Sequence, residues 1–71
     1  MDAKKKEIDQ MIDCALIATQ IACDALGRQD FIRCIFDEDS NHWNIEFEGG
    51  PVFTVAQEQA LNCSWRIHHE R

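Results

Sequence analysis

The chain has 71 residues, 45% of them hydrophobic and 28% charged, which excludes a disordered chain and leaves room for one domain. Seven Lys and Arg against thirteen Asp and Glu give a formal net charge of −6, which argues against a nucleic-acid binder because phosphates require cationic partners. No apolar run approaches the roughly 18 residues of a membrane span, so no membrane association is expected.

The first predicted element is a helix over residues 2–26, with Gly27 placed where a left-handed C-cap is needed. Its apolar residues recur at steps of three and four, the helical period. This expected core stripe comprises Ile8, Met11, Ile12, Ala15, Ala18, Ala22, Ala25 and Leu26. Ile17 and Ile21 add apolar groups on other faces, so we expect the second helix or another chain to cover part of this helix.

The second predicted element is a β-hairpin over residues 31–48 with a polar loop at 37–41. Its second strand alternates large apolar residues with polar ones, the pattern of a half-buried strand. The side chains expected to face the core are Ile32, Cys34, Phe36, Trp43, Ile45 and Phe47. Arg33 then faces solvent beside Glu46 or Glu48 as a weak cross-strand ion pair.

A turn at 49–51, Gly-Gly-Pro, separates the hairpin from a second predicted helix at about 55–68. Thr54 and Gln57 have the spacing of a capping box, in which the two side chains bond to each other's backbone amides. Residues 52 and 53 form at most a short extended piece in this interpretation. The core stripe expected for this helix comprises Ala56, Ala60, Cys63, Ser64 and Ile67.

The predicted order is therefore helix, strand, strand, helix. It indicates a small two-layer α+β domain in which two helices lie on one face of an antiparallel hairpin or sheet. The first helix spans about 36 Å at 1.5 Å per residue, whereas a six-residue strand spans about 20 Å. The helix should therefore overhang the sheet, and a two-stranded sheet offers too little area to cover it.

The predicted partner-binding side chains share one property: they are apolar or aromatic and lie off the core stripes. They are Leu61, Trp65, His68, Ile17 and Ile21. A Leu-Trp-His stripe on an outer helix face is typical of a helix-in-groove or dimer contact, although Trp65 in the core is an alternative. Because a chain this short buries too little surface alone, the sequence predicts a cytoplasmic protein that binds another protein or forms a homodimer.

Residues 30–58 contain seven acids and one base, Arg33, so the negative charge is concentrated around the hairpin. The predicted acidic surface comprises Asp37, Glu38, Asp39, Glu46 and Glu48. It favours a solubilising strand face that also guards an edge against aggregation. The alternative is an inhibitor of a basic protein that imitates nucleic-acid phosphates.

The four cysteines are irregularly spaced, without a Cys-x-x-Cys pair or a secretory leader pattern, so we expect reduced thiols. A metal-binding module is a second alternative, because Cys34, His42 and Cys63 come from different elements and could converge. A Cys63–His42 nucleophile–base pair is disfavoured because Cys63 is expected on a core stripe. The sequence therefore predicts no enzyme, no metal and no cofactor.

Overall fold

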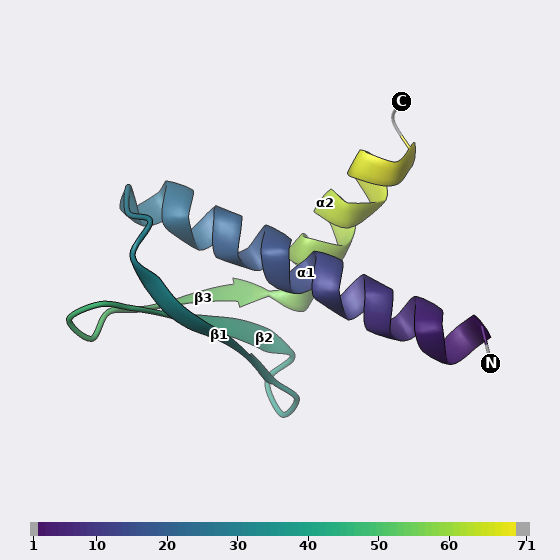
Figure 1. Ribbon diagram of the computed structural model, residues 1–71, viewed down its shortest axis with the longest axis horizontal. Coiled ribbons are helices and arrows are strands. Elements are labelled where there is room, and N and C mark those ends of the chain that lie inside the picture. The colour runs from purple at the N-terminus through teal and green to yellow at the C-terminus, as the bar shows by residue number, and fades with distance from the viewer. Residues whose placement is uncertain (1, 70–71) are drawn as a thin grey trace.

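The computed structural model describes the backbone of residues 2–69 and the side chains of residues 8–64 and 66. Its elements are α1 (Asp2–Leu26), β1 (Phe31–Asp37), β2 (His42–Phe47), β3 (Val52–Ala56) and α2 (Gln57–His69). Within these residues the three strands form one antiparallel sheet in the order β1-β2-β3. Both helices lie on the same side of this sheet, so the predicted α+β class is confirmed (Figure 1).

The structure differs from the prediction at residues 52–56, which form a third strand. Val55 pairs with Trp43 of β2 and is buried, and Thr54 Oγ1 donates a hydrogen bond to Asn44 Oδ1 at 3.0 Å. The expected capping box at Thr54 is therefore wrong, and α2 begins at Gln57. The β-branched residues of this segment suit a pleated surface, and pairing with β2 satisfies their backbone groups.

The core lies between α1 and the sheet. The central strand β2 supplies Trp43, Ile45 and Phe47, so its predicted alternation is confirmed. The residues that α1 buries are small: Cys14, Ala18, Ala22 and Cys23. Small side chains let the helix axis approach the sheet closely, and the large side chains of β2 fill the space between them.

α1 ends as its sequence predicts. Gly27 has a φ of 65°, and the Arg28 amide donates to the Cys23 carbonyl at 3.0 Å. This bond is the six-to-one bond of a Schellman cap. It turns the chain back toward the sheet, where β1 begins four residues later at Phe31.

β1 is irregular at its start. Arg33 lies opposite Glu46, one of the two expected partners, and its Nε donates to Glu46 Oε1 at 2.8 Å. The expected core position of Ile32 is wrong, because the register shifts between Phe31 and Arg33 and leaves Ile32 exposed. The shift adds one residue to β1, as a β-bulge does, and it places Phe31 rather than Ile32 opposite Phe47.

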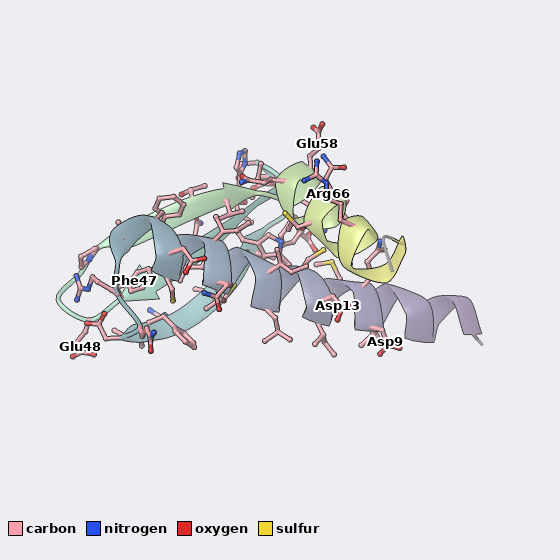
Figure 2. All side chains as sticks on the ribbon, turned by 90° about the horizontal axis from the view of Figure 1, so that it is seen from above. Asp9, Asp13, Phe47, Glu48, Glu58 and Arg66 are labelled. Atoms are coloured by element: carbon pink, nitrogen blue, oxygen red, sulfur yellow. The ribbon has the colours of Figure 1, made fainter. Side chains whose placement is uncertain are left out.

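The N-terminal half of α1 runs past the sheet, as its length requires (Figure 1). Asp9 and Asp13 lie on this overhang (Figure 2). The molecule measures 40 × 29 × 18 Å, and its accessible surface is 5352 Å². A compact monomer of 8.2 kDa exposes about 4,500 Å². The chain thus exposes roughly 800 Å² more than its mass requires.

Neither helix, over the residues described here, has the length and hydropathy needed to cross a bilayer.

Candidate interaction surface

Three large aliphatic side chains line one flank of α1. Ile8, Ile12 and Leu16 are 58%, 52% and 66% exposed. Successive steps of four residues place them above one another on a single helix face. We call these three residues the α1 stripe.

The edge strand β1 carries a second exposed apolar set. Phe31, Ile32 and Ile35 are 49%, 56% and 43% exposed. A hollow lined by Leu16, Cys23 and Phe31, among others, connects the α1 stripe to the start of β1. The two sets meet at this hollow through Leu16 and Phe31, and Ile32 and Ile35 continue along the edge strand. We call the α1 stripe and the three β1 residues together the α1–β1 face.

A shallow apolar groove extends this face toward the N-terminal end of α1. Four of its lining residues, Ile8, Met11, Ile12 and Ala15, belong to α1, and the fifth is Trp43 of β2. The Trp43 ring is otherwise buried and packs against Phe36 with centroids 4.9 Å apart. The groove is open because the sheet ends beneath the overhanging part of α1 (Figure 1).

The expected core positions of Ile8, Ile12, Ala25 and Leu26 are wrong, because all four are exposed. The two isoleucines lie at the edge of the apolar stripe on a part of α1 that has no sheet beneath it. Met11 takes the inward position there and packs against the core. The spacing of the α1 stripe was visible in the sequence, but only the position of the sheet decides that it is exposed.

The predicted partner-binding residues lie elsewhere. Ile17 and Ile21 are half-buried and pack against the core, as does Leu61 of α2. The side chains of Trp65 and His68 lie outside the described residues, so the predicted Leu-Trp-His stripe stays a prediction. The structure does not place Ile17, Ile21 or Leu61 on the α1–β1 face.

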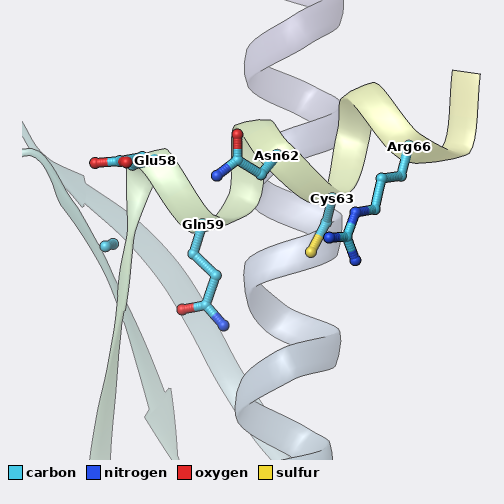
Figure 3. A pocket seen from close by; sticks show the side chains of 6 residues that line it. Glu58, Gln59, Asn62, Cys63 and Arg66 are labelled. Carbon is cyan, nitrogen blue, oxygen red and sulfur yellow. The ribbon is translucent and has the colours of Figure 1, made fainter. Parts of the chain in front are cut away.

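A polar hollow is lined mainly by side chains of α2 (Figure 3). Its lining side chains are Ala56, Glu58, Gln59, Asn62, Cys63 and Arg66. Cys63 is half-buried here rather than fully in the core. The hollow combines one acid, one base and two amides without a buried polar group directed into it, so its chemistry favours no particular ligand.

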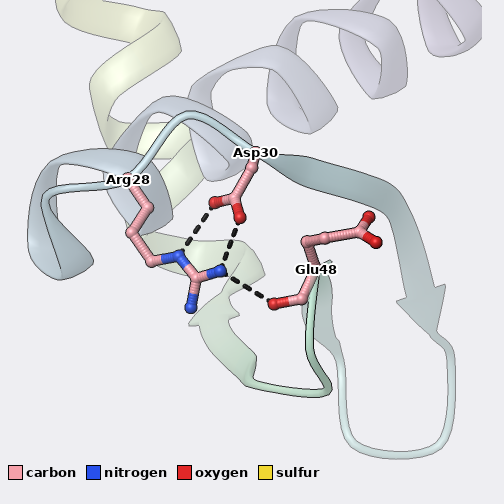
Figure 4. A network of polar contacts seen from close by, with 3 residues as sticks. All are labelled: Arg28, Asp30 and Glu48. Atoms are coloured by element: carbon pink, nitrogen blue, oxygen red, sulfur yellow. Dashed lines mark hydrogen bonds and ion pairs between the residues drawn. The ribbon is translucent and has the colours of Figure 1, made fainter.

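Two arginines pair with acids around the sheet, and one of these acids, Glu46, belongs to the predicted acidic surface. Glu46 accepts the hydrogen bond from Arg33, and Asp30 accepts two from Arg28, whose Nη2 also donates to the Glu48 carbonyl at 2.8 Å (Figure 4). These bonds from Arg28 hold the pKa of Asp30 below its ordinary value.

Three of the remaining four acids of this surface, Asp37, Glu38 and Asp39, lie at the β1–β2 turn. A hydrogen bond from Ser40 and others within the turn lower the pKa of Asp37, and Glu38 and Asp39 are exposed beside it. Glu48 is exposed at the other end of the sheet, after β2. The acidic residues are therefore divided between the two ends of the sheet and its arginine-paired middle.

The three residues of the metal alternative do not converge. Cys34 faces α1, with its Sγ 3.8 Å from the Ala15 carbonyl, whereas His42 shares a contact of 2.6 Å with the Ser40 carbonyl at the β1–β2 turn. Cys63 lines the hollow on α2. Among the side chains described, no group of three His, Cys, Asp or Glu residues is placed to hold a metal ion.

No protein-family model matches the chain, and no match was found among curated proteins or among solved structures.

Proposed function

We propose that this protein is a small cytoplasmic protein–protein interaction module that associates with a second copy of itself through the α1–β1 face. One observation carries the proposal: six large apolar side chains from α1 and the edge strand β1 are exposed, and the two sets meet at a hollow lined by Leu16 and Phe31. Contiguous apolar patches of this kind mark interaction sites more often than isolated exposed residues do.

The exposed area supports a dimer rather than a small-molecule site. The chain exposes roughly 800 Å² more than a compact monomer of its mass, and the overhanging part of α1, with Ile8 and Ile12 exposed, contributes to this excess. The groove beside Trp43 is open and shallow, so it does not enclose a ligand.

The borders of the face also fit an interface. Asp9 and Gln20 are exposed on α1 next to the stripe, and Arg33 is exposed on β1. An apolar centre with a polar rim is the usual composition of a protein interface.

Sedimentation velocity over a range of micromolar concentrations tests the proposal. We expect wild-type protein to sediment as a dimer, and Leu16→Glu to shift it toward monomer because a charge is buried at the centre of the face. Val52→Glu is the matched control, since Val52 is also exposed but lies on the far strand β3. A wild-type chain that remains monomeric throughout would refute the proposal.

A further inference from the structure

We infer that the two copies join their sheets through β1, with each β1 pairing antiparallel to the β1 of the other copy. This inference rests on the proposed self-association and specifies its geometry. Among the described residues β1 pairs with β2 only and has no strand on its other side. Its outer backbone groups are therefore available to a strand of another chain, the arrangement known as β-augmentation.

The bulge at Ile32 sets the length of the pairing segment. It interrupts the ladder between Phe31 and Arg33, so the regular part of β1 is residues 33–37. Ile35 is the centre of this segment and is exposed on the face of the sheet opposite the helices. A symmetric pairing of the whole segment therefore places Ile35 opposite Ile35 of the second copy.

The same register pairs opposite charges. With Ile35 on the two-fold axis, Arg33 of each copy lies opposite Asp37 of the other, on the same face of the joined sheet. Moving the two-fold axis one residue toward the N-terminus would place Arg33 against Ile35, and moving it two residues would bring the two Arg33 side chains together. Because directly opposed like charges destabilise a sheet and opposite charges stabilise it, the symmetric register is favoured.

The α1 stripe lies where the added strand needs cover. The hollow that Leu16 and Phe31 share shows that Leu16, at the C-terminal end of the stripe, is on the β1 side of α1. A strand added at β1 would bring the helix side of the second copy, where Cys34 and Phe36 pack half-buried against that copy's own core, next to the α1 stripe. These apolar side chains suit the apolar stripe of α1, which extends beyond its own sheet (Figure 1).

Charge reversal in trans tests the register. In a dimer of Arg33→Asp, two acidic side chains lie opposite each other at both charge pairs, and in a dimer of Asp37→Arg, two basic side chains do. Each variant should therefore associate about tenfold or more weakly than wild type. An equimolar mixture restores opposite charges at both pairs, and we expect the association to recover. Any effect of either substitution within its own chain, such as the loss of the Arg33–Glu46 bond, is the same alone and in the mixture.

Cross-linking of Ile35→Cys provides a readout that does not depend on these charges. Residues directly opposite in antiparallel strands have Cα atoms about 4.5–5.5 Å apart, within reach of a disulfide. Diamide accepts two electrons and two protons from two thiols, so it should convert this variant to a covalent dimer. Wild type and Thr54→Cys, which places an exposed thiol on β3, are the controls for the existing cysteines.

The outcomes separate this inference from the proposed function. Recovery in the mixture together with selective cross-linking at Ile35 supports the β1 pairing. A wild-type dimer whose single variants associate normally and whose Ile35→Cys variant cross-links no faster than the controls overturns it, while self-association stands. A monomeric wild-type chain overturns both.

Discussion

The indole N–H of Trp43 donates a hydrogen bond to Oε1 of Gln57, and both side chains are buried. Gln57 is the first residue of α2, and its Nε2 lies 3.7 Å from the Met11 Sδ of α1. Its backbone amide donates to the Asn41 carbonyl at 3.1 Å. One side chain therefore links β2 to both helices at the point where β3 becomes α2.

Replacing Trp43 with Ala should destabilise the domain by ~3–5 kcal/mol, because it opens a cavity and leaves Gln57 without its donor. A domain of this size has little more stability than that, so we expect the variant to be largely unfolded. Urea denaturation followed by circular dichroism measures the change. Trp43→Phe is the control that keeps most of the ring packing, and it should lose less. Wild-type melting of Trp43→Ala would contradict the placement of this strand in the core.

Replacing Gln57 with Leu should cost about 1–3 kcal/mol, because the Trp43 N–H is then buried without an acceptor. Combining Gln57→Leu with Trp43→Phe removes both polar partners, so the double variant should be more stable than the sum of the single changes predicts. Chemical denaturation of wild type, the two single variants and the double variant gives the coupling free energy between the two side chains. Additive changes would show that the hydrogen bond contributes nothing measurable.

Replacing Arg28 with Ala should raise the pKa of Asp30 toward its ordinary value, because the guanidinium no longer bonds to the carboxylate. A lowered pKa stabilises the fold above the unfolded value, about 3.9, and this contribution is lost as the pH falls through the folded value. The variant should therefore lose less stability on acidification than wild type. NMR titration of the Asp30 carboxyl measures the shift directly, and an unchanged pKa would contradict the role given to Arg28.

The cysteines should differ in reactivity in the native state. Burial raises the pKa of both Cys14 and Cys34, and Cys14 is fully buried in the core. Cys63 is half-buried beside the hollow on α2, so a thiol reagent at mildly alkaline pH should modify Cys63 well before Cys14. Mass spectrometry of timed samples gives the order, and denatured protein is the control for equal intrinsic reactivity. Faster labelling of Cys14 would contradict its place in the core.

The sequence was sufficient for the features that depend on neighbours along the chain. The 3.6-residue period and Gly27 defined α1, and the alternation of Trp43, Ile45 and Phe47 defined β2. Arg33 was predicted beside Glu46 or Glu48 from the loop and the apolar pattern of the hairpin, and the structure pairs it with Glu46. These features arise from backbone geometry and side-chain spacing that act over a few residues.

Only the tertiary structure decided the third strand, the bulge at Ile32 and the exposure of the α1 stripe. Thr54 and Val55 suit either a helix start or a strand, and the free edge of β2 selected the strand. Ile8 and Ile12 fit a core stripe by spacing, but they lie on the part of α1 that extends past the end of the sheet. A periodic pattern tells which side chains share a face, whereas burial depends on whether another segment lies against that face.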